Sequence, residues 1–171
     1  MSDKKILLVE DDNSLRSTIS TFLELEQYEV DAVGSTREAL LRLGDNSYPI
    51  VVSDIYLDER TGLDVLSAAR ESFAGCKVIL MTGRASMETV MKATQGGMFA
   101  YLPKPFELDE LLDVVQRAEN ALGVRDDHDD PETEVEDLPD SDIVACSAQR
   151  VTVYLKIAKV APTDETVLIQ G

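Results

Sequence analysis

The 171-residue chain contains no tryptophan, a single histidine and only two cysteines. It also has no apolar run near the roughly eighteen residues that a membrane-spanning helix needs, so we expect no membrane contact. Cys76 and Cys146 lie far apart and in no spacing typical of a metal site, which predicts two free thiols in a reducing compartment. The segment Met1–Lys5 leads into a strand and lacks the pattern of a signal peptide, so we expect a cytoplasmic location.

Basic residues are scarce as well, with 16 Lys and Arg against 33 Asp and Glu, for a formal net charge of −17. Residues 126–142 alone hold ten of the acids and none of the bases. Such a segment buries too little apolar surface to offset the entropy of ordering, so we interpret residues 123–142 as an acidic flexible linker. The overall acidity argues against direct binding of nucleic acid by this chain.

Residues 1–122 alternate five times between short apolar runs and segments of helical periodicity. The expected strands are Lys5–Val9, Tyr28–Val33, Ile50–Asp54, Lys77–Met81 and Ala100–Pro103. The expected helices are one whose apolar face carries Leu15, Ile19, Phe22 and Leu23, then Thr36–Leu43 closed by Gly44, Gly62–Glu71, Ser86–Gln95 closed by Gly96-Gly97, and Leu108–Leu122. This alternation predicts an α/β domain, a flavodoxin-like (βα)5 doubly wound parallel sheet with strand order 2-1-3-4-5.

Polar residues follow four of these strands. Asp11 and Asp12 follow the first strand, Asp54 ends the third, Thr82 follows the fourth and Lys104 follows the fifth. Because the carboxyl ends of parallel strands meet at one edge of the sheet, we expect these side chains to lie close together. Three carboxylates, one hydroxyl and one amine suit a metal-assisted acceptor of a phosphoryl group.

Carboxylates crowded into one crevice repel each other unless a hard cation binds them, and Mg²⁺ suits this donor set. We expect Asp12 and Asp54 to bind the metal directly and Asp11 to bind it through a water. The backbone carbonyl of Tyr56 is a further expected ligand. Asp54 is also the expected nucleophile, because the metal would neutralise charge as the phosphoryl group arrives.

Lys104 would pair with one phosphoryl oxygen and the hydroxyl of Thr82 would donate to another. Pro105 follows the lysine, and a cis Lys104–Pro105 bond at a strand end would turn the chain sharply and direct the lysine inward. Taken singly, each of these residues has an ordinary structural interpretation; Asp11 or Asp12, for example, could cap the first helix. Their joint occurrence at four strand ends favours a site.

Two other functions remain compatible with these residues. One is a Mg²⁺-dependent phosphohydrolase that uses Asp54 as nucleophile on small phosphate esters, although no inserted cap segment is visible. The other is a flavin-binding electron carrier, although Glu10, Asp11 and Asp12 stand where its phosphate loop should be rich in Ser, Thr and Gly.

The chain resembles the receiver domain of two-component response regulators. The resemblance rests on Glu10-Asp11-Asp12, Asp54, Gly62, Thr82 and Tyr101–Phe106. It implies that a sensor histidine kinase donates a phosphoryl group to Asp54, that Thr82 moves toward the phosphate and that Tyr101 rotates inward. The domain over residues 1–122 would then be a phosphorylation switch with slow self-dephosphorylation, and not a turnover enzyme.

Residues 143–171 resemble the start of the AAA+ ATPase domain of sigma-54-dependent, nitrogen-regulator-like transcription activators. The expected strand Thr166–Gln170 ends at Gly171, and the chain contains no phosphate-binding loop of the form Gly-x4-Gly-Lys-Ser/Thr, so we expect no ATP hydrolysis through that site. The resemblance implies contact with RNA polymerase, its sigma factor and DNA only through domains missing here. Whether Leu108–Leu122 also forms a homodimer contact stays open.

Overall fold

The computed structural model describes residues 4–57, 61–83 and 86–122. Its strands are β1 (Lys5–Val9), β2 (Glu29–Val33), β3 (Ile50–Asp54), β4 (Lys77–Thr82) and β5 (Ala100–Pro103). They form one parallel sheet in the order β2-β1-β3-β4-β5. The predicted fold class and strand order are therefore confirmed.

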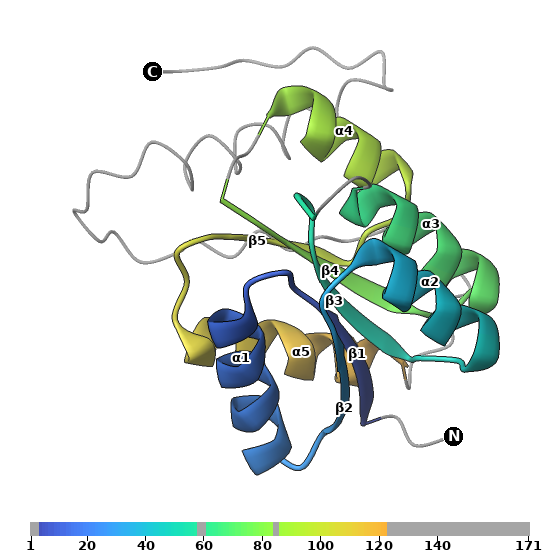
Figure 1. The fold of residues 1–171 in the computed structure, drawn as a ribbon. Helices are drawn as coiled ribbons and strands as arrows, with labels where there is room; N and C mark the ends of the chain where they lie inside the picture. Colours follow the sequence, from blue (N-terminus) through green and yellow to red (C-terminus); the bar gives the residue numbers. More distant parts are fainter. Residues whose placement is uncertain (1–3, 58–60, 84–85, 123–171) are drawn as a thin grey trace.

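Five helices connect the strands and cover both faces of the sheet. They are α1 (Asn13–Leu25), α2 (Thr36–Asp45), α3 (Gly62–Ser72), α4 (Met87–Gln95) and α5 (Leu108–Leu122). Helices α1 and α5 lie on one face, and α2, α3 and α4 lie on the other (Figure 1). In the described part of the chain, no helix is long and apolar enough to cross a bilayer. The predicted linker 123–142 and the predicted partial domain 143–171 lie outside the described residues.

The side chains of the sheet alternate between two cores. Leu7 and Val51 pack in the cluster that contains the inner faces of α2, α3 and α4. Ile6 and Val52 pack in the cluster that contains α1 and α5. Because both faces are covered, β1, β3 and β4 are nearly continuous apolar runs, whereas the edge strand β2 carries Glu29 and Asp31 and is mostly not buried.

Two glycine stops were predicted, and they differ in outcome. The stop at Gly96-Gly97 is confirmed, because Gly96 caps α4 and Gly97 takes the left-handed φ of 75°. The stop at Gly44 is wrong, because α2 continues through it and ends when the N–H of Asn46 donates to the carbonyl of Arg42 at 2.9 Å. A glycine inside a helix costs only about 1 kcal/mol, which the packed turns on either side can offset.

A polar cluster lies beside the α2–α4 core at the amino end of the sheet. The hydroxyl of the buried Tyr48 donates to Asp31 Oδ2 at 2.6 Å, and Lys5 Nζ lies 3.4 Å from the same oxygen. The Tyr48 hydrogen bond, with the charge of Lys5, holds the pKa of Asp31 below its usual range. A carboxyl pKa lowered by folding contributes stability above the unfolded pKa and loses it as pH falls through the folded pKa.

We therefore expect Tyr48→Phe to lower the free energy of unfolding by about 1 kcal/mol near neutral pH. The difference in unfolding free energy between the two proteins should narrow in strongly acidic solution, as the pH falls through the lowered pKa of Asp31. Urea unfolding of both proteins at neutral and at strongly acidic pH measures this. An equal difference at both would contradict the assigned charge-assisted bond.

Candidate functional site

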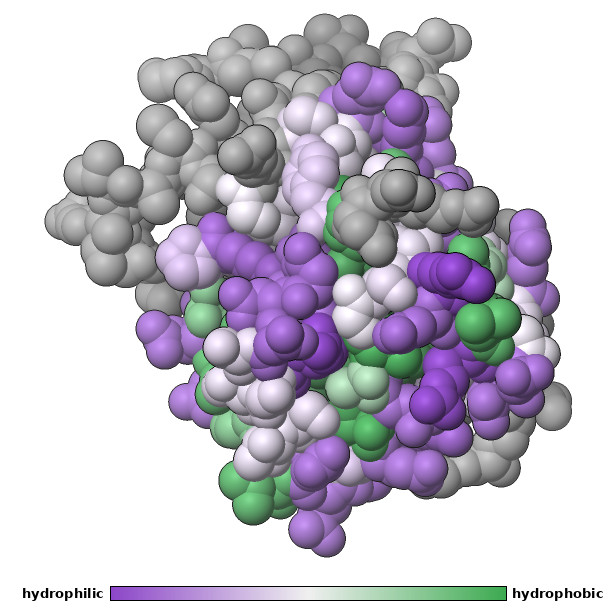
Figure 2. All heavy atoms as spheres, viewed as in Figure 1, coloured by the Kyte–Doolittle hydropathy of each residue, from purple (hydrophilic) through white to green (hydrophobic). Residues whose placement is uncertain are grey.

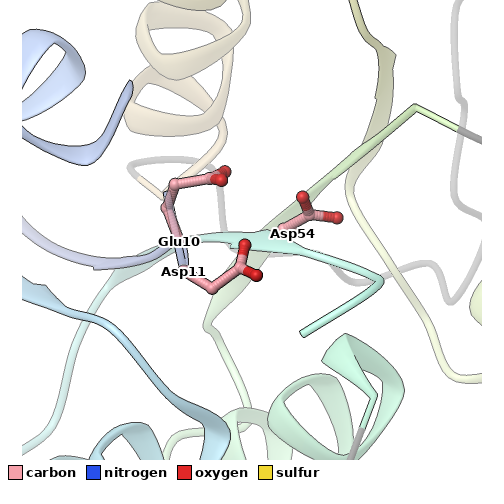
Figure 3. A group of neighbouring side chains, drawn as sticks. All are labelled: Glu10, Asp11 and Asp54. Atoms are coloured by element: carbon pink, nitrogen blue, oxygen red, sulfur yellow. The ribbon is translucent and has the colours of Figure 1, made fainter. Parts of the chain in front are cut away.

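Three carboxylates converge at the carboxyl ends of β1 and β3, which are neighbours in the sheet. Glu10 and Asp11 follow β1, and Asp54 is the last residue of β3. One oxygen of each carboxylate lies within 4.8 Å of the others. Figure 3 shows the side chains of Glu10 and Asp11 extending from the end of β1 toward the side on which Asp54 ends β3. We call these three residues the acidic group. Hydrophilic residues gather on the surface over the upper end of α1 and the loop before it (Figure 2).

Asp12 has a different local role. Its backbone is extended, with φ −69° and ψ 113°, and its Oδ1 accepts from the N–H of Leu15 at 2.8 Å. Asp12 is thus the N-cap of α1, the structural alternative recognised from the sequence. The acidic group instead includes Glu10, which the sequence reasoning did not assign as a ligand. A direct contact of Asp12 with a metal stays a prediction.

Lys104 joins the acidic group from the end of β5. Its Nζ lies 2.7 Å from Glu10 Oε2 and 2.5 Å from Asp54 Oδ2. The backbone N–H of Lys104 donates to the carbonyl of Thr82 at 2.7 Å, so the ends of β4 and β5 are tied together. The Lys104–Pro105 bond is cis, as the sequence predicted. Lys104 and Asp54 thus lie together at one edge of the sheet, as expected, and the pairing of Lys104 with a phosphoryl oxygen stays a prediction.

The pKa values of Lys104 and Glu10 are shifted by burial and by the hydrogen bond between the two side chains. Burial raises the pKa of Glu10, which is 1% exposed, and the hydrogen bond from Lys104 opposes that rise. Burial alone would lower the pKa of Lys104, but the hydrogen bonds and charges of Asp54 and Glu10 outweigh it and raise the pKa. Removing Lys104 would leave two carboxylates in this crevice without their counter-ion.

The carboxylate of Asp54 is held at both oxygens. The backbone N–H of Tyr56 donates to Oδ1 at 2.9 Å, while Lys104 contacts Oδ2. The backbone is fixed too, because the N–H of Ile55 donates to the carbonyl of Met81 at 2.9 Å. Asp54 is therefore buried but precisely oriented toward the strand ends. The assignment of the Tyr56 carbonyl as a metal ligand stays a prediction.

The two expected switch residues are both buried. Thr82 ends β4 with 1% of its surface exposed, and Tyr101 lies in β5 opposite Leu80 with 9% exposed. Burial raises the pKa of the Tyr101 hydroxyl to about 12. Tyr101 packs in the core cluster of the α2–α4 face. The movements that the resemblance implies for both residues stay predictions.

Comparison with known proteins agrees with this arrangement. Residues 6–116 match the response regulator receiver domain family.

The chain belongs to this family.

Relatives of this receiver domain include the response regulator protein FleR of Pseudomonas aeruginosa, which is 37% identical over 98% of this chain and 33% of its own length. The DNA-binding transcriptional regulator NtrC of Azospirillum brasilense is 28% identical over 100% of this chain and 35% of its own length. The chain thus spans about a third of the length of these curated relatives.

Solved receiver domains share the fold. A CheY-like receiver domain protein from Methanospirillum hungatei aligns with a TM-score of 0.68 and 29% identity, over 70% of this chain and 95% of the other. The beryllofluoride-activated NtrC4 receiver domain dimer aligns with a TM-score of 0.65 and 29% identity, over 70% of this chain and 98% of the other. The similarity covers the described domain.

Receiver domains bind Mg²⁺ at an acidic pocket, and the residues present here fit such an ion. The acidic group offers only oxygen donors, which a hard cation prefers. Its carboxylates come from two adjacent strands and lie close enough to share one ion. Lys104 offsets only one of the three negative charges, so the group remains attractive to a cation.

Proposed function

We propose that this receiver domain accepts a phosphoryl group on Asp54 from a histidine kinase. The proposal rests on how the Asp54 carboxylate is oriented within the acidic group. The N–H of Tyr56 donates to one of its oxygens, and the ammonium of Lys104 contacts the other. A carboxylate oriented in this way reaches an incoming phosphorus atom without first losing rotational freedom.

In the proposed reaction a carboxylate oxygen of Asp54 attacks the phosphorus of a phosphohistidine. The P–N bond breaks, and the departing imidazole takes up a proton. The product is an acyl phosphate on Asp54. Attack by water later releases inorganic phosphate and restores the carboxylate, so the domain acts as a timed switch.

Lys104 and Thr82 would receive the phosphoryl oxygens. The ammonium of Lys104 already contacts Asp54 and needs only a small shift to pair with an oxygen attached to it. Thr82 stands at the neighbouring strand end, tied to Lys104 through the backbone. We propose that its hydroxyl binds a second phosphoryl oxygen.

Asp11, Asp54 and Glu10 would hold Mg²⁺, with Asp12 and the Tyr56 carbonyl as the further contributors that the sequence predicted. When bound, the ion would neutralise the negative charge that gathers where the phosphoryl group meets the carboxylate. The residues of the chain supply the orientation, and Lys104 supplies the remaining positive charge.

The output of the switch would lie in a longer protein. The matches to FleR and NtrC extend over nearly all of this chain, which supports the proposal that residues 143–171 begin the ATPase domain of a sigma-54-dependent activator. RNA polymerase, its sigma factor and DNA would be contacted through other domains. The dimeric NtrC4 receiver supports a homodimer, and we expect the protein to act in the cytoplasm.

Asp54→Asn should abolish labelling of the chain by acetyl phosphate in the presence of Mg²⁺. The amide is a poor nucleophile, while its size preserves the packing. Intact mass spectrometry at neutral pH would detect a single labile phosphoryl adduct on the wild-type chain. EDTA should prevent its formation.

Asp113→Asn is the matched control, because Asp113 is an exposed carboxylate on α5. It should be labelled like the wild type. Persistent labelling of Asp54→Asn would place the phosphoryl group elsewhere. No adduct, together with steady release of phosphate from small esters, would point to the phosphohydrolase instead.

A further inference from the structure

Arg16, in the first turns of α1, contacts the backbone of the acidic group rather than its carboxylates. Its Nη1 donates to the carbonyl of Glu10 at 2.6 Å and lies 3.4 Å from the carbonyl of Asp11. Its Nη2 donates to the side chain of Asn13. The guanidinium of Arg16 thus contacts the backbone carbonyls of Glu10 and Asp11, which carry two of the three carboxylates.

The same guanidinium packs against the loop after β2. A Cβ on Gly34 would lie 2.9 Å from Arg16 Nη1 and 3.3 Å from its Cζ, so the absence of a side chain makes room for the arginine. The N–H of Glu10 donates to the carbonyl of Val33 at 3.1 Å, which ties the same two loops together. Arg16 therefore fills the junction of the β1–α1 and β2–α2 loops.

We propose that Arg16 is a positioning residue that sets the Mg²⁺ affinity of the acidic group by holding the backbone of Glu10 and Asp11. The proposal rests on the Mg²⁺ site of the proposed function. Outer partners that orient metal ligands commonly change metal affinity by about tenfold or more. Here the oriented unit is the loop backbone, and the carboxylates follow it.

A positioning role and a pure charge effect of Arg16 predict opposite changes in Mg²⁺ affinity when the arginine is removed. A positive side chain near a cation site repels the cation, so a pure charge effect would make Mg²⁺ bind more tightly after Arg16→Gln. Loss of positioning would make Mg²⁺ bind more weakly, because the ligands must be ordered at the moment of binding. The sign of the change therefore separates the two explanations.

The guanidinium is also the group that the geometry requires. A planar fork donates to several acceptors at once, while a lysine ammonium is a single compact charge on a flexible stem. Arg16→Lys keeps the charge and loses the fork. We therefore expect it to bind Mg²⁺ more weakly than the wild type, as Arg16→Gln does.

The test is a Mg²⁺ titration of the full chain followed by ¹H–¹⁵N NMR. The amide of Tyr56 is the reporter, because its N–H donates directly to the carboxylate of Asp54 in the acidic group. We expect an affinity about tenfold lower for Arg16→Gln. Arg117→Gln, which removes an exposed charge from α5, should leave the affinity unchanged.

Gly34→Ala should disturb the position of Arg16 while leaving all three carboxylates of the acidic group in place. The φ of Gly34 is not in the left-handed region, and the three atoms nearest to the new methyl all belong to the end of the flexible Arg16 side chain, so the variant should fold and displace the guanidinium. We expect weaker Mg²⁺ binding from it alone and no further loss when it is combined with Arg16→Gln. Urea unfolding without Mg²⁺ checks that each variant is folded.

Each outcome decides the question. Unchanged or tighter binding by Arg16→Gln, or by Gly34→Ala if the arginine variant does not fold, would overturn the positioning role. Additive losses in the double variant would show that Gly34 acts independently of Arg16 and would also contradict it. If the Tyr56 amide signal of the wild type did not shift on addition of Mg²⁺, the proposed metal site would be wrong, and so would the role of Arg16.

Discussion

Gly62→Ala is expected to lower the free energy of unfolding by about 3 kcal/mol and to slow phosphorylation of Asp54. A Cβ at this position would lie 2.2 Å from the carbonyl oxygen of Asp54 and 2.9 Å from the Cα of Ile55. Both are backbone atoms, so the clash is relieved only by opening the turn that follows β3. The N–H of Gly62 also donates to the carbonyl of Ile55 at 2.9 Å, and this bond would be strained.

Urea unfolding and the rate of adduct formation with acetyl phosphate measure the two effects. Gly44→Ala is the matched control, because Gly44 is exposed within α2 and an added Cβ meets nothing within 4 Å. It should stabilise the domain by up to about 1 kcal/mol, since alanine favours a helix. If Gly62→Ala were as stable as Gly44→Ala, the close approach at the turn would not constrain the fold.

The strands and the site were predictable for the same reason. The inner strands of a parallel sheet covered on both faces need apolar runs, and the polar residues at the ends of four of the five strands mark the carboxyl edge. Asp54 is the clearest example, because every residue of β3 is buried and the carboxylate comes last. Lys104 could be assigned to the same edge although 50 residues separate it from Asp54.

The sequence could not predict which of the three consecutive acidic residues caps α1 and which lies beside Lys104. Glu10, Asp11 and Asp12 have the same charge, and their directions depend on how the loop turns between β1 and α1. Because α1 begins at Asn13, Asp12 is drawn into the N-cap and Glu10 takes the inner position beside Lys104. The one sequence signal was the place of Asp12 before a helical pattern, which is typical of a cap.

The contacts of Arg16 could not be predicted from the sequence for a different reason. Its partners are backbone carbonyls, which every residue carries, so the pattern contains no complementary side chain that would indicate the contact. The space it occupies is created by Gly34, which belongs to another loop. Such contacts depend on how two loops meet and require the tertiary structure.

Lys104→Met is expected to slow phosphorylation of Asp54 by about a hundredfold, the usual cost of removing a preorganised donor. It should also lower the free energy of unfolding by about 2 kcal/mol, because Glu10 and Asp54 lose a charged hydrogen-bond donor inside a crevice. Mg²⁺ should nevertheless bind more tightly than to the wild type. The reason is that the variant keeps all three carboxylates and loses the positive charge that competes with the ion.

The three quantities are measured by adduct formation with acetyl phosphate, by urea unfolding, and by Mg²⁺ titration followed at the Tyr56 amide. Lys92→Met is the matched control, since Lys92 forms an exposed ion pair with Glu88 on α4, at 2.7 Å, and should change none of them appreciably. Slower phosphorylation with tighter Mg²⁺ binding would assign Lys104 to the phosphoryl group. Weaker Mg²⁺ binding would mean that the lysine instead orders the acidic group for the ion, and the proposed division of roles between Lys104 and Arg16 would be wrong.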